Sequence, residues 1–148
     1  MSSSPVLLFD LHGTLADVSA LILHPQLTDC FVNQEAEELC TRYTCILITA
    51  GSQAEVEQVF KQTSLNQKIS FVEVITAAEG GAEKASGKPF LVLQEKYDRI
   101  IAMIGDSDAD EQGARASNIP CIRIAAQPTL PEQQAELTRA IKRAIALS

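Results

Sequence analysis

Carboxylates, one imidazole, one hydroxyl and one ammonium group are the side chains of this sequence whose types and spacing could do chemistry together. Carboxylates gathered at one place repel one another unless a cation lies among them, and hard oxygen ligands with room for water suit Mg²⁺. A metal ion, a lysine, a hydroxyl and backbone N–H groups together form a site for a phosphoryl group. In chain order the candidates are Asp10 and His12, Thr49 with Ala50 and Gly51, Lys88, and Asp106 with Asp110.

The elements that must position these residues alternate between strands and helices. Short apolar runs bounded by turn residues predict buried strands over residues 6–9, 45–48, 71–75, 100–104 and 121–125. Amphipathic stretches predict helices over 29–42, 52–64, 89–96, 108–117 and 131–147, and 76–88 is predicted to be a loop. The alternation predicts an α/β fold: a single domain over residues 1–148, with a doubly wound, Rossmann-like parallel sheet and helices on both faces.

This fold would bring the candidate residues together, because ligands of an open parallel sheet bind beyond the carboxyl ends of the strands. Asp10 follows the first predicted strand, Thr49 the second and Asp106 the fourth. Asp110, in the first turn of the next predicted helix, could face the same cation as Asp106. Asp10 can then act as a nucleophile that takes the phosphoryl group covalently.

Each residue also has a purely structural interpretation. Asp10 can be a turn residue, and Thr49 can belong to the cap of the following helix. The stretch 106–110 can be a solvated acidic loop, and Lys88 a surface charge. The order of the residues, each at a predicted strand end or helix start, favours the chemical interpretation.

The same residues resemble the motifs of the haloacid dehalogenase-like (HAD) hydrolases, a superfamily made up mostly of Mg²⁺-dependent phosphatases. The motifs appear in the family's order, and the resemblance covers about residues 5–125. The family's D-x-D-G-T is matched by Asp10-Leu11-His12-Gly13-Thr14, its strand-end Thr or Ser by Thr49, its lysine (often in G-K-P) by Gly87-Lys88-Pro89, and its G-D-x-x-x-D by Gly105-Asp106-Ser107-Asp108-Ala109-Asp110.

The resemblance implies a role for each residue and Mg²⁺ as the cofactor. Asp10 would be the nucleophile, and Lys88 would neutralise it while holding the phosphoryl group together with Thr49. The substrate would be a phosphorylated small molecule or a bulkier phosphoester. Phosphate would be bound by Thr49, Ala50, Gly51 and Lys88, and the metal by Asp10, Asp106, Asp110 and the backbone carbonyl of His12.

One residue departs from the family's pattern. His12 stands where the family's phosphatases carry a second Asp, which donates a proton to the leaving group and then activates water. An imidazole can do this work near neutral pH, so we expect His12 to be catalytic in a phosphate monoester hydrolase that forms an aspartyl-phosphate at Asp10.

Three alternatives compete with this hypothesis. One is a different reaction of the family, whose members without the second Asp include dehalogenases. Another is a weakly active or inactive protein that binds phosphate and Mg²⁺ in a regulatory role. The third, a phospho-accepting receiver, does not fit, because the third predicted strand ends in Thr76-Ala77-Ala78 without an acceptor Asp.

No cap domain is expected over the site. The intervals 15–48 and 50–87 are largely used by predicted core elements, and independent domains rarely have fewer than ~50 residues. Residues 15–28 could form a flap, or their Leu21-Ile22-Leu23 could form a contact in a homo-oligomer.

Composition limits the partners and the compartment. The 148 residues hold 12 Lys+Arg against 19 Asp+Glu, a formal net charge of −7, so no nucleic-acid partner is expected. No apolar run approaches the ~20 residues that span a bilayer, so no membrane partner is expected. No basic segment precedes the first apolar run, which argues against a secretory signal. The four cysteines form no C-x-x-C pair and predict reduced thiols in a cytoplasmic protein.

Overall fold

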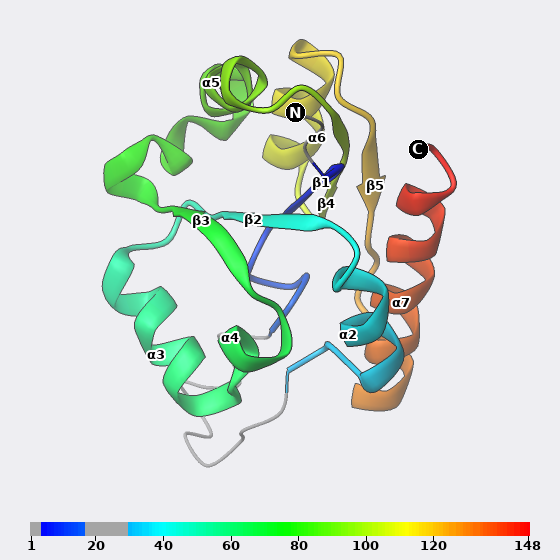
Figure 1. Cartoon of the computed structure of the whole chain (residues 1–148). Coiled ribbons are helices and arrows are strands. Elements are labelled where there is room, and N and C mark those ends of the chain that lie inside the picture. The colour runs from blue at the N-terminus through cyan, green and yellow to red at the C-terminus, as the bar shows by residue number, and fades with distance from the viewer. Residues whose placement is uncertain (1–3, 17–29) are drawn as a thin grey trace.

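Five parallel strands form one sheet in this computed structural model, which describes residues 4–16 and 30–148 (Figure 1). The sheet order is β3-β2-β1-β4-β5, so the chain reverses its winding direction at the central strand. This arrangement confirms the predicted doubly wound α/β fold. The strands are β1 (Val6–Phe9), β2 (Thr44–Ile48), β3 (Phe71–Ile75), β4 (Ile100–Gly105) and β5 (Cys121–Arg123).

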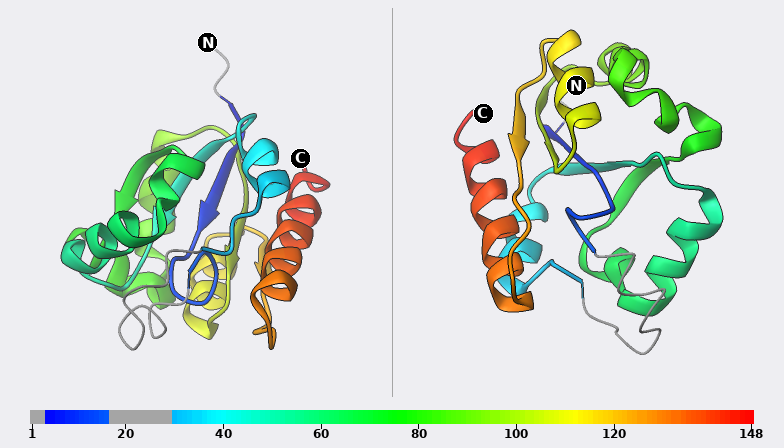
Figure 2. Two further views of the ribbon diagram at one scale, coloured as in Figure 1. Left: turned by 90° about the horizontal axis from the view of Figure 1, so that it is seen from below. Right: turned by 180° about the vertical axis from the view of Figure 1, so that it is seen from behind.

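Helices cover both faces of the sheet (Figure 2). The helices α5 and α6 pack on one face, and α2, α3, α4 and α7 pack on the other. Their bounds are α2 Gln34–Cys40, α3 Gln53–Thr63, α4 Leu65–Lys68, α5 Lys88–Lys96, α6 Asp108–Ala116 and α7 Leu130–Ile145, and two 3₁₀ helices, η1 (Ala77–Glu79) and η2 (Gly81–Ser86), precede α5.

The position of β1 at the centre of the sheet explains why its sequence is apolar without a break. Val6 and Leu8 of β1 belong to the core under α5 and α6, whereas Leu7 and Phe9 belong to the core under α7. All four side chains are fully buried. A strand covered on both faces has no position for a polar residue until it leaves the sheet, which happens at Asp10.

The first and third connections differ from the prediction. α2 is shorter than the helix predicted over 29–42, because the Asn33 side chain caps it by accepting a hydrogen bond from the Ala36 N–H (2.8 Å). The loop predicted over 76–88 contains η1 and η2. Most of the proposed flap 15–28, with its Leu21-Ile22-Leu23, lies outside the described residues.

The interval between Thr49 and Asp106 holds no inserted domain. Between Thr49 and Asp106 the described chain consists of the core elements from α3 to β4 and their short connections. The expected absence of a cap therefore holds for this interval. Among the described helices, none is long and apolar enough to cross a membrane.

Close packing of α6 on η2 yields a first prediction. A Cβ atom at Gly113 of α6 would overlap the backbone carbonyl of Lys84 and the ring of Phe90. We expect Gly113→Ala to lower the free energy of unfolding by about 3 kcal/mol through overpacking. Gln112→Ala, at the exposed neighbouring position, is the control and should change it by less than about 0.5 kcal/mol. Urea denaturation measures both; equal stability of the two variants would contradict the close packing.

Candidate active site

Three of the predicted site residues stand where neighbouring strands leave the sheet. Asp10 directly follows β1, Thr49 follows β2 and Asp106 follows β4. The sheet ladder extends to two of them: the Asp10 N–H donates to the Ile104 carbonyl (3.0 Å), and the Thr49 N–H donates to the Ile75 carbonyl (2.8 Å). The backbone at Asp10 and Thr49 is therefore as fixed as the sheet itself.

A buried lysine joins two of the carboxylates. Lys84 Nζ lies 2.6 Å from Asp10 Oδ1 and 2.8 Å from Asp110 Oδ1 and donates a hydrogen bond to each. The exposed fractions are 4% for Lys84, 6% for Asp10 and zero for Asp110. Charged groups this deeply buried must be paired, and each hydrogen bond between two ionised groups is stronger than a neutral one. This network ties η2, the end of β1 and the first turn of α6 to one another.

The lysine beside Asp10 is Lys84 and not Lys88, which corrects the prediction from the G-K-P motif. Lys88 begins α5 with its side chain 71% exposed, and its Nζ lies 3.9 Å from Glu83 Oε1. The difference arises because η2 turns the chain between the two lysines. Lys84 faces the sheet edge from within η2, whereas the first turn of α5 directs Lys88 toward solvent.

Sequence reasoning missed Lys84 because its placement depends on two tight contacts between elements. A Cβ at Gly81 would meet the carbonyl oxygens of Thr76 (2.9 Å) and Ile75 (3.0 Å), so η2 begins against the end of β3. At its other side η2 packs on Gly113 of α6. The one local signal is that Lys84 lies between two glycines, and nothing in that spacing favours it over Lys88.

Three carboxylates converge at the sheet edge. Asp10, Asp106 and Asp110 offer oxygen atoms that all lie within 4.8 Å of one another. The half-buried Asp106 can approach because its carboxylate packs directly over Gly13, which has no side chain and a left-handed φ of 76°. Three carboxylate oxygens form a hard donor set of the kind that Mg²⁺ prefers, so the residues present fit the expected metal.

Asp110 is held by a capping box at the start of α6. The Asp110 N–H donates to Ser107 Oγ (3.2 Å), and the Ser107 N–H donates to Asp110 Oδ2 (3.3 Å). The Ser107 Oγ–H also donates to Asp110 Oδ2 (2.9 Å). The other oxygen, Oδ1, accepts from Lys84. Both oxygens of Asp110 are therefore engaged, and its carboxylate has a fixed orientation.

The electrostatics of this cluster favour a cation. Burial raises the pKa of Asp10 above its ordinary value, and the Lys84 ammonium opposes that rise. Burial and the Asp10 charge likewise raise the pKa of Asp110. One ammonium group therefore faces more negative charge than it can balance, and a divalent cation would supply the missing positive charge.

His12 and Thr49 converge over Gly51. A Cβ at Gly51 would lie 2.9 Å from His12 Nε2 and 3.3 Å from Thr49 Oγ1. The Gly51 N–H donates to Thr49 Oγ1 (3.0 Å), so this N–H is already used, and the buried threonine keeps its own hydroxyl proton to donate to a ligand. Ala50 is exposed beside them.

A carboxylate from α3 lies next to the imidazole. Glu55 Oε2 is 3.4 Å from His12 Nε2. The spacing of Ser52 and Glu55 at the start of α3 is typical of a capping box, in which the Glu55 carboxylate would accept from the Ser52 N–H. Ser52 Oγ does accept from the Glu55 N–H (3.2 Å), but the Glu55 carboxylate faces His12.

Comparison with known proteins identifies the fold. No protein-family model matches the sequence, and no curated protein matches it. Solved structures do match: a candidate beta-phosphoglucomutase from Thermotoga maritima has a TM-score of 0.69 at 13% identity, over 94% of this chain and 99% of that one. A HAD-superfamily hydrolase of subfamily IA from Geobacter sulfurreducens has a TM-score of 0.60 at 16% identity, over 83% of this chain and 90% of that one.

A HAD-superfamily hydrolase from Ehrlichia chaffeensis has a TM-score of 0.57 at 15% identity, over 95% of this chain and 99% of that one. At these identities the likeness concerns the fold. The chain has the fold of the HAD-superfamily hydrolases, as the sequence motifs predicted.

The buried network predicts opposite effects of two substitutions on the free energy of unfolding, measured by urea denaturation in metal-free buffer. Asp10→Asn removes one of two carboxylates that share a single lysine. Because folding raises the pKa of Asp10, its ionised form destabilises the fold, and we expect the free energy of unfolding to rise in this variant. Lys84→Met leaves both carboxylates unpaired and should lower it by about 3–5 kcal/mol. Lys88→Met, at the exposed lysine, should change it by less than about 0.5 kcal/mol.

The pH dependence of the same measurement follows from the pKa of Asp10. Folding raises this pKa, so the folded chain binds the proton more tightly than the unfolded chain. Protonation of Asp10 therefore stabilises wild type as the pH falls. The difference in free energy of unfolding by which Asp10→Asn exceeds wild type should shrink toward acid. A difference between Asp10→Asn and wild type that widens toward acid would contradict the raised pKa of Asp10.

Proposed function

We propose that this chain is a HAD-superfamily hydrolase that uses Mg²⁺ to hydrolyse a phosphate monoester through an aspartyl-phosphate at Asp10. One observation carries the proposal: the Lys84 ammonium group lies buried between Asp10 and Asp110 at the carboxyl edge of the sheet. A network of this charge at the sheet edge would bind a divalent cation and an anion together, and the fold is one that HAD hydrolases share.

Asp10, Asp106 and Asp110, with the backbone carbonyl of His12, would hold the metal. When bound, Mg²⁺ would supply positive charge that offsets the negative charge of the phosphoryl group and of the attacking carboxylate. Ser107 and Lys84 already hold the Asp110 carboxylate in one orientation.

In the first step the Asp10 carboxylate is the nucleophile. A carboxylate oxygen forms a bond to phosphorus, the bond from phosphorus to the ester oxygen breaks, and the ester oxygen takes a proton from His12 to leave as an alcohol. The Thr49 hydroxyl would donate a hydrogen bond to one phosphoryl oxygen. Lys84 would offset the charge of another, a role that the sequence motif assigned to Lys88.

In the second step water attacks the phosphorus of the aspartyl-phosphate. Its proton passes to His12, the bond from phosphorus to Asp10 breaks, and inorganic phosphate leaves with the carboxylate restored. Glu55, 3.4 Å from His12 Nε2, would offset the positive charge of the imidazolium that exists before the first step and after the second.

A second candidate function is a protein that binds phosphate and Mg²⁺ but turns over little. The presence of His12 in place of the family's second Asp favours it. Under either function the ligand would be a phosphorylated small molecule or a bulkier phosphoester. The cytoplasmic location, the single domain, the possible homo-oligomer and the lack of nucleic-acid and membrane partners remain predictions.

Phosphate release from a panel of phosphate esters tests the first function. Wild type should release phosphate only with Mg²⁺, and Asp10→Asn should be at least about 10⁴-fold slower. Lys84→Met should lose about 10²–10³-fold, whereas Lys88→Met, the control that removes an exposed lysine, should stay within about twofold. Activity in Asp10→Asn near that of wild type would contradict the proposal.

His12 variants separate the two functions. If His12 protonates the leaving group, His12→Ala should slow the first-turnover release of alcohol from an alkyl phosphate by about 10²–10⁴-fold. The same first step with an aryl phosphate, whose leaving group needs no proton, should be slowed by much less. Equal losses on both substrates would contradict this role. An inactive wild type that gains turnover on His12→Asp would instead support the binding function.

A further inference from the structure

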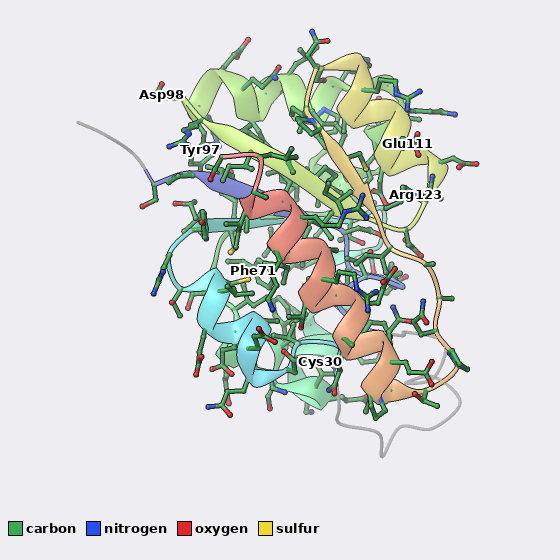
Figure 3. The ribbon with its side chains drawn as sticks, turned by 90° about the vertical axis from the view of Figure 1, so that its right-hand side faces the viewer. Cys30, Phe71, Tyr97, Asp98, Glu111 and Arg123 are labelled. Atoms are coloured by element: carbon green, nitrogen blue, oxygen red, sulfur yellow. The ribbon has the colours of Figure 1, made fainter. Side chains whose placement is uncertain are left out.

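Arg123 lies at the end of β5 and reaches the turn that carries two of the site's carboxylates. Its guanidinium donates three hydrogen bonds: from Nη2 to the backbone carbonyl of Asp106 (2.9 Å), and from Nη1 to Glu111 Oε2 (2.8 Å) and Asp108 Oδ1 (3.1 Å). Arg123 and Glu111 face each other across the gap between β5 and α6 (Figure 3).

The register of the sheet fixes where this guanidinium begins. Arg123 pairs with Gly105, the last residue of β4, and the next N–H along the chain, that of Ile124, donates to the Gly105 carbonyl (2.9 Å). Two successive carbonyls, those of Gly105 and Asp106, are thus held by two successive residues, Ile124 and Arg123. The sheet ladder is continued one residue further by a side chain in place of a backbone N–H.

The turn needs this support because it is crowded with negative charge. Four acidic residues occur within six positions, and two of them face the site while two face Arg123. The Asp106 carboxylate branches from the Cα next to the carbonyl that Arg123 holds, so fixing that carbonyl restricts the direction in which the Cα–Cβ bond presents the carboxylate. The four are Asp106, Asp108, Asp110 and Glu111.

The three contacts do not contribute equally. The Asp108 side chain is 87% exposed, so its ion pair with Arg123 is screened by solvent and contributes little. Glu111 is 32% exposed and anchors the guanidinium more firmly. The bond to the Asp106 carbonyl is the one that acts on the site.

We propose that Arg123 is a positioning residue that holds the Asp106 carboxylate in its metal-binding orientation by clamping the Asp106 backbone carbonyl and the start of α6. The inference rests on the proposed function, because it takes the acidic cluster to be the Mg²⁺ site. Arg123 itself touches neither metal nor substrate in this account.

The loss of Arg123 should change the affinity for Mg²⁺ in opposite directions, depending on whether its charge or its positioning role dominates. Removing a cation near a metal site weakens the repulsion of Mg²⁺, so charge alone would tighten binding. Loss of a group that orients a metal ligand weakens binding, by about 10–100-fold at comparable sites. The sign of the change therefore distinguishes a positioning residue from a nearby charge.

The test is a titration of the full chain with Mg²⁺ alone, followed by the amide resonances of residues 105–110. Arg123→Gln should raise the dissociation constant by about tenfold or more. Arg123→Lys, which keeps the charge but not the guanidinium fork, should raise it less, and it carries the test if Arg123→Gln does not fold. Arg115→Gln is the matched control: Arg115 also pairs with Glu111 (2.7 Å) and is 79% exposed, so its loss should leave binding unchanged or slightly tighter.

Three outcomes are decisive. Weaker binding in both Arg123 variants, with Arg115→Gln at or below the wild-type dissociation constant, supports the proposal. Folded Arg123 variants that bind Mg²⁺ as tightly as wild type or more tightly overturn it and leave the proposed function standing. A wild type that binds no Mg²⁺ overturns the metal site, and with it both proposals.

Discussion

The buried ammonium group of Lys84 is the feature on which the rest of the site depends. It lies within hydrogen-bond distance of Asp10 and Asp110, where almost no solvent reaches any of the three side chains. Without it, two carboxylates would face each other in a medium of low polarity, and one or both would take up a proton. With it, Asp10 can stay ionised and therefore nucleophilic. The same excess of negative charge that makes the metal-free cluster unfavourable is what would attract a divalent cation and, beside it, a phosphoryl group.

Two kinds of constraint position these groups: the strand ends place them approximately, and contacts between elements set their final positions. Parallel strands all end at the same edge, so Asp10, Thr49 and Asp106 meet there because each follows a strand. That rule sets positions only to within a residue or two. The final placement comes from backbone and side-chain hydrogen bonds around the turn after β4, where Ser107 and Arg123 hold the acidic residues from two sides, and from the packing of η2 against its neighbours. The sheet thus fixes the backbone at the strand ends, and the segments that connect the strands and helices orient the side chains of the site.

The fold and most of the site could be predicted from the sequence because they depend on local patterns. The unbroken apolar run before Asp10 predicts a strand covered on both faces, and the Gly105-to-Asp110 spacing predicts a strand end followed by a helix start. Lys84 could not be predicted in this way. Its position depends on where η2 packs between the end of β3 and Gly113 of α6, a contact between segments far apart in the sequence. The pairing of His12 with Glu55 was missed for a related reason, because a capping pattern at Ser52 accounted for Glu55 locally.

Covalent capture of the phosphoryl group on Asp10 tests the central claim most directly. His12→Ala would be mixed with Mg²⁺ and an aryl phosphate, which can form the aspartyl-phosphate without a proton donor, and quenched in acid at successive times. The account predicts that the peptide containing Asp10 gains the mass of one phosphoryl group, because the variant lacks the base that activates water for the second step. Release of the aryl alcohol with no phosphorylated Asp10 at any time, or with the phosphoryl group on another residue, would contradict it.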